Sequence, residues 1–159
     1  MEIRVGSGFD VHQLKEGLDF WLGGIIVPHS KGALGHSDAD VLIHSICDAL
    51  LGAANLGDIG KNFPDTDPKY KAIDSKILLS SVMQIIRERG YKLGNVDSTI
   101  CLQKPKIQDY IPQMKKTLAS CMGVDIDIVS IKATTTEELS FVGREEGVSA
   151  YATVLITSD

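Results

Sequence analysis

The sequence predicts a single α/β (α+β) domain in which a mixed sheet of four to five strands carries three main helices on one face. The 159 residues are enough to bury a self-sufficient core. Several segments alternate apolar and polar residues as strands do, and three longer segments repeat apolar residues at helical spacing. Three helices can cover only one face of such a sheet, so we expect the other face to pack against further copies of the chain.

Charge and cysteine content narrow the function classes. The formal net charge is −5 and the pI about 5.3, with Lys and Arg scattered, which disfavours nucleic acid or an anionic membrane as a partner. The three cysteines, Cys47, Cys101 and Cys121, lie in apolar patterns and favour free thiols in the cytoplasm. We find no signal-peptide pattern and no apolar run near the roughly 20 residues of a membrane span, so a soluble, unprocessed protein is expected.

Two strands and a loop are expected before the first helix. Residues 2–9 alternate as a strand, and residues 18–27 read as a second strand that pairs with it in a hairpin. Residues 29–36 contain two glycines and few apolar anchors. This segment is therefore expected to be a mobile lid.

A helix is expected from Ser37 to about Asn55. Ser37 can cap its first turn, and Asp40, three positions on, would complete a capping box. At four-residue spacing, Asp40, His44 and Asp48 share one helix face. The two carboxylates either orient the imidazole or form a solvated polar stripe, and the pattern leaves both interpretations open.

The rest of the chain alternates between helix and strand patterns. In order, it predicts a turn-rich acidic loop over residues 57–68, a helix from the cap Asp74 to Gly90, a strand over 95–103, a helix over 110–122 with Gly123 as its C-terminal cap, a strand over 129–134 and a long strand over 148–157. The acidic loop could bind hydroxyl groups or a cation, or consist only of Asx turns.

The clearest chemical signal is a half-site for a metal ion. Asp10 and His12 are separated by one residue on an extended segment, so their side chains point the same way. His44, early in the first predicted helix, is the best third ligand, with a hydrogen-bonded core histidine as the alternative. One carboxylate and two imidazoles suit zinc, and three protein ligands leave a fourth position open, as in catalytic sites.

Two further segments could bind phosphate. Residues 132–137 place three threonines directly after a strand, with hydroxyl and backbone donors, and Glu137 could hold a divalent cation. Lys104 and Lys106 close the preceding strand beside a helix start. They could hold a nucleotide phosphate, although exposed lysines at such a position are usually only solvated.

Six stretches of the sequence form a recognisable series. They are GFDVH (8–12), GHSDADV (35–41), DALLGA (48–53), GDIGKNFPDTD (57–67), GYKLGNVD (90–97) and KATTTE (132–137), followed by Phe141 and Gly143-Arg144. In this order and spacing they resemble the 2-C-methyl-D-erythritol 2,4-cyclodiphosphate synthase family, over essentially the whole chain. The resemblance implies one synthase domain over residues 1–159.

The resemblance also implies a reaction and an assembly. The enzyme, a phosphorus–oxygen lyase of the non-mevalonate isoprenoid precursor pathway, would cyclise 4-diphosphocytidyl-2-C-methyl-D-erythritol 2-phosphate to 2-C-methyl-D-erythritol 2,4-cyclodiphosphate and release CMP. A phosphate with a second pKa near 6 is largely a dianion at neutral pH, so this nucleophile needs no dedicated base. The assembly would be a homotrimer with sheets packed around a threefold axis and active sites at subunit interfaces.

Residue by residue, the resemblance assigns roles to matching positions. It implies that Zn²⁺ is bound by Asp10, His12 and His44. It also implies that a second divalent cation, Mg²⁺ or Mn²⁺, is bound by Glu137 together with the substrate phosphates. His36 and Thr135 match the catalytic positions that stabilise the transition state. The positions implied to bind substrate are Asp10, His12, His36, Ser37, Asp58, Ile59, Gly60, Phe63, Pro64, Asp65, Thr66, Asp67, Leu102, Gln103, Lys104, Pro105, Lys106, Ile107, Gln108, Thr134, Thr135, Thr136, Glu137, Phe141 and Arg144.

Three points complete the expectations from sequence. Phe141 and Arg144 match a region near the threefold axis that can hold an isoprenoid diphosphate in some family members. One alternative is a zinc-dependent phosphohydrolase, which the lack of a clear second ligand cluster or general base beside Asp10 and His12 disfavours. The other is a non-enzymatic nucleotide-binding trimer with a structural metal.

Overall fold

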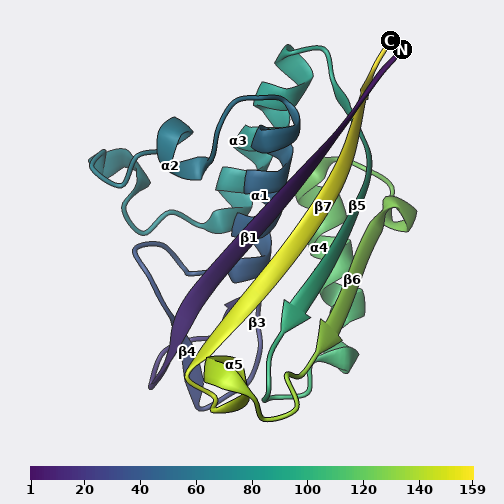
Figure 1. The fold of residues 1–159 in the computed structure, drawn as a ribbon. Coiled ribbons are helices and arrows are strands. Elements are labelled where there is room, and N and C mark those ends of the chain that lie inside the picture. Colours follow the sequence, from purple (N-terminus) through teal and green to yellow (C-terminus); the bar gives the residue numbers. More distant parts are fainter.

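A five-stranded mixed sheet forms one layer of the molecule, and three helices lie behind it (Figure 1). The computed structural model describes residues 1–159, and the strand order is β4-β1-β7-β5-β6. The strands are β1 (Glu2–Glu16), β4 (Lys31–Leu34), β5 (Lys92–Cys101), β6 (Val129–Thr134) and β7 (Gly147–Ser158). Only β5 and β6 run parallel, and the other neighbouring pairs are antiparallel.

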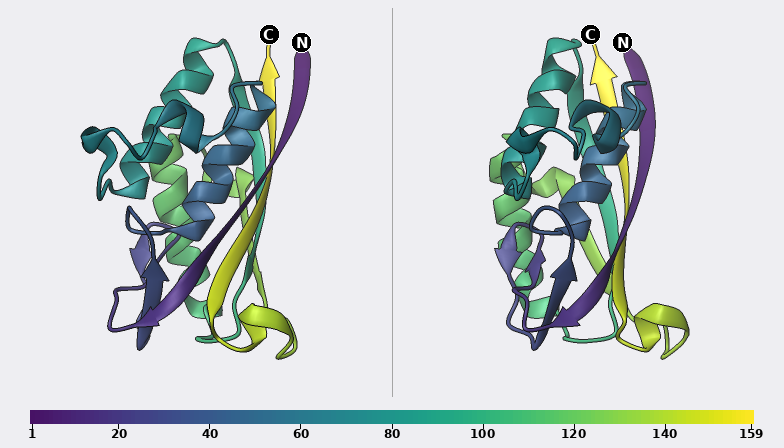
Figure 2. Two further views of the ribbon diagram at one scale, coloured as in Figure 1. Left: turned by 60° about the vertical axis from the view of Figure 1, so that its left-hand side comes forward. Right: turned by 90° about the vertical axis from the view of Figure 1, so that its left-hand side faces the viewer.

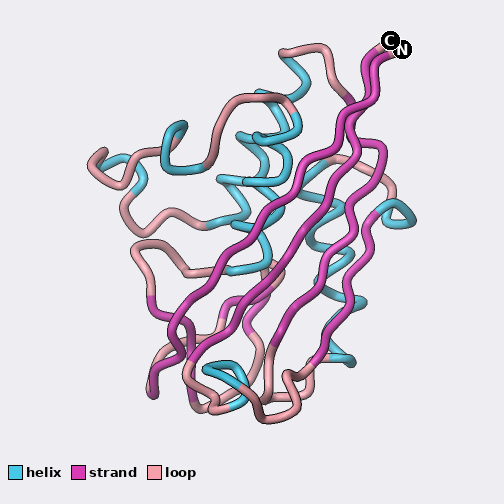
Figure 3. Tube along the Cα trace, in the orientation of Figure 1, coloured by secondary structure: helices cyan, strands magenta, loops and turns pink.

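The two ends of the chain form the centre of this sheet. β1 and β7 pair from Glu2 with Ser158 to Gln13 with Gly147, which brings the termini side by side (Figure 3). Along β7, Val148, Ala150, Ala152, Val154 and Ile156 are buried toward the helices, whereas the residues between them are largely on the opposite face. The alternation that predicts a strand over 148–157 therefore separates a core face from an open face.

Three helices cover the core face, as predicted (Figure 2). They are α1 (Val41–Ala53), α3 (Ser75–Glu88) and α4 (Ile111–Met122). The predicted cap Asp74 begins α3, and Gly123 ends α4 in the left-handed conformation, as predicted. The remaining helical turns are short: α2 (Ile59–Asn62), α5 (Ser140–Gly143), and the 3₁₀ turns η1 (Pro68–Tyr70), η2 (Gln108–Tyr110) and η3 (Ile126–Ile128).

Two glycines of β1 let it lie directly against α1. A Cβ on Gly8 would lie 1.9 Å from the backbone oxygen of Ser45, and one on Gly6 would lie 2.0 Å from that of Ala49. No side chain fits in this contact. The close approach brings the segment after Gly8 against the part of α1 that carries His44.

The predicted hairpin between residues 2–9 and 18–27 is wrong. β1 continues to Glu16 and pairs there with β4, from Gln13 with Leu34 to Glu16 with Lys31. The segment 29–36 is therefore partly a sheet strand and not a loop throughout. Residues 18–27 form a separate small hairpin of β2 (Trp21–Leu22) and β3 (Ile25–Ile26).

The turn between β2 and β3 explains this difference. Gly23 and Gly24 both have positive φ angles, 62° and 78°, which interrupt an extended strand and reverse the chain. Their N–H groups donate to the two carboxylate oxygens of Asp40, at 3.0 and 2.7 Å. The small hairpin is thus held by the start of α1.

The predicted cap of the first helix is also wrong. Asp40, not Ser37, is the N-cap of α1, and its carboxylate accepts from the N–H of Ile43 at 3.0 Å. Ala39 has a φ of 57°, so the chain turns sharply before the helix begins. Asp40 is fully buried and already accepts from the small hairpin, and this tertiary contact selects it as the cap.

The sheet face away from the helices is open and apolar. Its exposed large apolar side chains are Ile3, Val5, Phe9, Val11 and Tyr151, with exposed fractions between 43% and 65%. The rings of Phe9 and Tyr151 lie 4.9 Å apart. Only α5 lies on this side, at one end of the sheet (Figure 2). None of the helices has the length and apolar character needed to cross a membrane.

Candidate metal centre and active site

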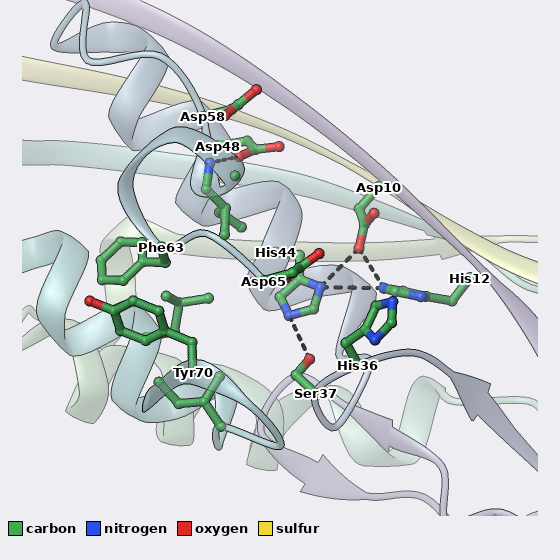
Figure 4. Close-up of a pocket in the computed structure, with 14 residues that line it drawn as sticks. Asp10, His12, His36, Ser37, His44, Asp48, Asp58, Phe63, Asp65 and Tyr70 are labelled. Atoms are coloured by element: carbon green, nitrogen blue, oxygen red, sulfur yellow. Dashed lines mark hydrogen bonds and ion pairs between the residues drawn. The ribbon is translucent and has the colours of Figure 1, made fainter. Parts of the chain in front are cut away.

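Asp10, His12 and His44 converge at one end of a cavity (Figure 4). The Oδ2 atom of Asp10 lies 2.9 Å from Nε2 of His12 and 3.1 Å from Nδ1 of His44, and the two nitrogens are 3.3 Å apart. Tetrahedral ligands at about 2.0–2.1 Å from a zinc ion lie roughly 3.3 Å from one another. The three atoms therefore fit a tetrahedral ion, and the predicted half-site and its third ligand come together.

The electrostatics of the cluster favour a cation. Burial alone would raise the pKa of Asp10, but its contacts with the imidazoles of His12 and His44 lower it to about 2. Burial also opposes the charged form of His44, yet the hydrogen bond and the negative charge of Asp10 outweigh it, so the pKa of His44 is raised. A proton is thus held where a metal ion would bind.

Hydrogen bonds orient both imidazoles from outside the cluster. Nδ1 of His12 lies 3.0 Å from the backbone oxygen of Leu34 in β4. Nε2 of His44 lies 2.9 Å from the hydroxyl of Ser75 and 3.3 Å from that of Ser37. The sequence does not reveal Ser75, because it lies 31 residues from His44 and only the packing of α3 on α1 brings them together.

The proposed orienting role of Asp40 and Asp48 toward His44 finds no support in the contacts. Asp40 turns toward Gly23 and Gly24. Asp48 accepts instead from the N–H of Ile59, at 2.9 Å. Its carboxylate also lines the cavity, and burial raises its pKa.

The cavity has a volume of about 290 Å³ and extends from the cluster along α1 to the loop after it. Its lining residues are Asp10, His12, His36, Ser37, His44, Asp48, Asp58, Ile59, Gly60, Phe63, Asp65, Tyr70, Ile73 and Leu78. The rings of Phe63 and Tyr70 meet edge to face at 5.3 Å (Figure 4). One end is thus rich in ionisable groups and the other has an apolar wall.

Several of these lining residues were not among the predicted site residues. Tyr70, Ile73 and Leu78 belong to the apolar wall, and Leu78 is part of the apolar stripe that predicts the helix α3. An apolar residue of a helix has the same sequence pattern whether it faces the core or a cavity. The predicted residues Pro64, Thr66 and Asp67 do not line the cavity, and Asp67 caps the turn η1.

The predicted nucleotide segments lie together but away from this cavity. The N–H of Leu102 donates to the backbone oxygen of Thr134, and the N–H of Glu138 donates to the side chain of Gln103. Residues 102–108 and 134–137 therefore adjoin at the ends of β5 and β6, yet none of them lines the cavity. Glu137 has a left-handed backbone conformation, with a φ of 53°. No other potential metal ligands of this chain cluster with its carboxylate.

A second hollow, of about 360 Å³, lies at the end of the sheet beside α5. Phe141 lines it together with Val11 and Glu146. Arg144 pairs with Glu146 through two nitrogen–oxygen contacts of 2.9 and 3.2 Å. The two residues matched to the threefold axis thus lie near each other.

The model of the YgbB family matches residues 3–157. The chain belongs to the YgbB family. This YgbB chain is 64% identical to the 2-C-methyl-D-erythritol 2,4-cyclodiphosphate synthase of Bacteroides thetaiotaomicron over 159 residues, which cover 100% of both chains. The family resemblance inferred from the motifs is confirmed.

Solved structures agree with the YgbB fold. A 2C-methyl-D-erythritol-2,4-cyclodiphosphate synthase described as the bound form with CDP superposes with a TM-score of 0.90 at 36% identity, covering 97% of this chain and 100% of that chain. The bifunctional IspDF from Campylobacter jejuni superposes with a TM-score of 0.95 at 42% identity. The match covers 99% of this chain but 43% of that longer one.

Proposed function

We propose that the chain is a phosphorus–oxygen lyase that cyclises 4-diphosphocytidyl-2-C-methyl-D-erythritol 2-phosphate and releases CMP. The product would be 2-C-methyl-D-erythritol 2,4-cyclodiphosphate, an intermediate of the non-mevalonate isoprenoid pathway. The observation that carries the proposal is the cluster of Asp10, His12 and His44 at the polar end of a cavity in a YgbB chain. The name of the 64% identical relative, 2-C-methyl-D-erythritol 2,4-cyclodiphosphate synthase, supports the same reaction.

We assign Zn²⁺ to Asp10, His12 and His44, because one carboxylate and two imidazoles at tetrahedral spacing suit this ion. When bound, zinc would supply positive charge that aligns and polarises the substrate diphosphate. A second cation, Mg²⁺ or Mn²⁺, would be held by the phosphates and Glu137.

The chain's own groups position the reacting phosphates. His36 and Ser37 lie at the polar end of the cavity beside the cluster and can donate to phosphate oxygens (Figure 4). The attacking 2-phosphate is already largely a dianion, so catalysis rests on positioning and charge neutralisation. Thr135 would donate to the transition state from the nucleotide side.

The other end of the cavity suits the methylerythritol unit. Asp58 and Asp65 can accept hydrogen bonds from its hydroxyl groups, and the structure adds Asp48 to these acceptors. Phe63 and Tyr70 offer an apolar surface to its methyl group. Carboxylates repel phosphate groups, so their place near a phosphate site needs another reason. Binding of the neutral polyol by this acidic loop would provide it.

We propose that the cytidine pocket of residues 102–108 and 134–136 serves the cavity of a neighbouring subunit in a homotrimer. Within one chain the two regions lie apart, and the open apolar face of the sheet would be covered around a threefold axis. The CDP-bound form of a 36% identical structure supports a cytidine nucleotide as ligand. The free thiols Cys47, Cys101 and Cys121 fit a cytoplasmic enzyme.

Near that axis, Phe141 and Arg144 would hold an isoprenoid diphosphate, with the apolar chain against the ring and the diphosphate near the guanidinium. The pairing of Arg144 with Glu146 would have to open for this contact. Such a ligand would couple the activity of the enzyme to the concentration of the pathway's isoprenoid products.

The test is to incubate the enzyme with the cytidyl substrate, Zn²⁺ and Mg²⁺, and to follow phosphorus NMR and CMP release. We expect a cyclic diphosphate and CMP in equal amounts. The His44→Ala variant should lose both its bound zinc and its turnover. Inorganic phosphate or a linear diphosphate as the main product would indicate a phosphohydrolase instead. Full turnover of a zinc-free His44→Ala protein would show that the metal takes no part in the reaction, and the assigned role of zinc would fail.

A further inference from the structure

His44 offers its two ring nitrogens to different surroundings. Nδ1 faces Asp10 and His12 at 3.1 and 3.3 Å, and Nε2 faces the hydroxyl of Ser75 at 2.9 Å. A neutral imidazole carries its proton on only one nitrogen. His44 can therefore offer a lone pair to a metal through Nδ1 only when the proton is on Nε2.

The hydrogen-bond chain behind His44 has a defined direction. The Ser75 hydroxyl donates to Oδ1 of Asp38 at 2.5 Å, and the Ser75 N–H donates to Oδ2 at 2.9 Å. Asp38 also receives the N–H of Asp40, at 3.1 Å. A carboxylate surrounded by donors only accepts. The single hydroxyl proton of Ser75 is thus committed to Asp38, and its oxygen is left to accept from Nε2 of His44.

We infer that Asp38 and Ser75 are positioning residues for His44: when a metal ion takes the Nδ1 lone pair, the Ser75 oxygen accepts the remaining Nε2–H and fixes the ring. The inference rests on the metal site of the proposed function. The backbone carbonyl of Leu34 has the same role for His12. Because this carbonyl accepts the Nδ1–H of His12, the Nε2 atom of His12 stays free for the metal. The two ligands thereby bind through opposite ring nitrogens.

The arrangement around Ser75 is rigid. Ser75 is fully buried, is the first residue of α3 and is bound to Asp38 through both its backbone and its side chain. Ser37 is the competing partner, since a hydroxyl that donated to Nε2 would select the wrong tautomer. Its contact is longer, at 3.3 Å, and its oxygen already accepts from the N–H of Ala39. Of the two hydroxyls, Ser75 is therefore the main partner of Nε2.

The test combines a spectroscopic and a binding measurement on Ser75→Ala and Asp38→Asn. Nitrogen-15 NMR of the zinc-loaded protein reports which nitrogen of His44 carries the proton. We expect a slowly exchanging Nε2–H in the wild type and faster exchange of this proton with water in both variants. Competition with a chromophoric chelator measures zinc affinity, which we expect to fall about 10- to 100-fold in both.

Ser45→Ala is the matched control. Ser45 follows His44 in α1 and is equally buried, but its hydroxyl donates to the backbone oxygen of Leu42 at 2.8 Å. Its loss should leave the exchange of the Nε2–H and the zinc affinity of His44 unchanged. Both readouts are independent of turnover, so a protein that lacks cyclase activity still tests the inference.

Two results would overturn the inference. One is a wild-type His44 that carries its proton on Nδ1 in the zinc-loaded protein, a measurement that needs no variant and stands even if Ser75→Ala and Asp38→Asn fail to fold. The other is a folded Ser75→Ala protein with the wild-type Nε2–H exchange and zinc affinity. Failure of the proposed reaction would instead show as an intact Nε2–H and zinc site without CMP release.

Discussion

At the scale of single residues, the cluster of Asp10, His12 and His44 acts as one charged unit. Asp10 keeps its charge far into the acid range because the imidazoles lower its pKa to about 2. The same contacts raise the pKa of His44 above its usual 6.5. A proton and a metal ion therefore compete for the same lone pair.

This competition predicts the pH dependence of metal binding. Because the raised pKa means that His44 binds its proton more tightly, zinc affinity should begin to fall while the pH is still above 6.5 and continue to fall as acid is added. Chelator competition between about pH 8 and pH 5 measures this. Affinity that stays constant over this range would contradict the assignment of His44 as a ligand.

Asp40 carries a second prediction at this scale. Asp40→Ala would leave the buried N–H groups of Gly23, Gly24 and Ile43 without an acceptor, so we expect the free energy of unfolding to fall by at least about 2 kcal/mol. Urea denaturation measures the change. Asp74→Ala removes a half-exposed cap of α3 and should cost only about 1 kcal/mol. Equal losses in the two variants would refute the special role of Asp40.

At the scale of elements, the contact between β1 and α1 positions two of the proposed ligands against the third. Asp10 and His12 belong to β1 and His44 to α1, so the separation of strand and helix sets the ligand spacing. Gly6 and Gly8 make that separation small.

Gly8→Ala should therefore affect stability and metal binding together. The added Cβ would press on the backbone oxygen of Ser45 and force the strand away from the helix. We expect a loss of about 1–3 kcal/mol in the free energy of unfolding and weaker zinc binding. Denaturation and chelator competition measure the two effects.

Gly52→Ala, on the helix α1 that packs against β1, is the matched control. A Cβ there would meet only the backbone oxygen of Ser7, at 3.9 Å, and alanine favours a helix over glycine by about 0.5–1 kcal/mol. We expect equal or greater stability and unchanged zinc affinity. A Gly8→Ala protein that behaves like Gly52→Ala would show that the contact is not needed.

At the scale of the whole molecule, the open sheet face separates a monomer from the proposed trimer. Val5 is 65% exposed on that face, and Ile77 is 59% exposed on α3, in the helix layer. Val5→Glu would bury a carboxylate in the subunit contact. We expect it to sediment as a monomer with a native circular dichroism spectrum and with turnover reduced at least about tenfold.

Ile77→Glu places the same charge outside the proposed contact and should remain a fully active trimer. Sedimentation velocity and CMP release decide both cases. A Val5→Glu monomer with full turnover would show that the active site is complete within one chain, and the proposed sharing of sites between subunits would fail.

The amino-acid sequence by itself determined the layers of the fold and the three residues of the candidate metal site. Local periodicity predicts helices α3 and α4 and strands β6 and β7, because each of these elements buries one face against the core. Asp10 and His12 point the same way through strand geometry alone. The acidic loop likewise supplies the predicted side chains of Asp58 and Asp65 to the cavity.

Only the tertiary structure decided the pairing of β1 with β4, the cap at Asp40 and the support of His44 by Ser75 and Asp38. Each depends on hydrogen bonds between residues distant in sequence, such as Ser75 and Asp38, 37 positions apart. The local sequence pattern is compatible with several hydrogen-bond donors or acceptors for each buried polar group. Which of them meet is settled when the helices pack on the sheet, since burial makes every unpaired group costly.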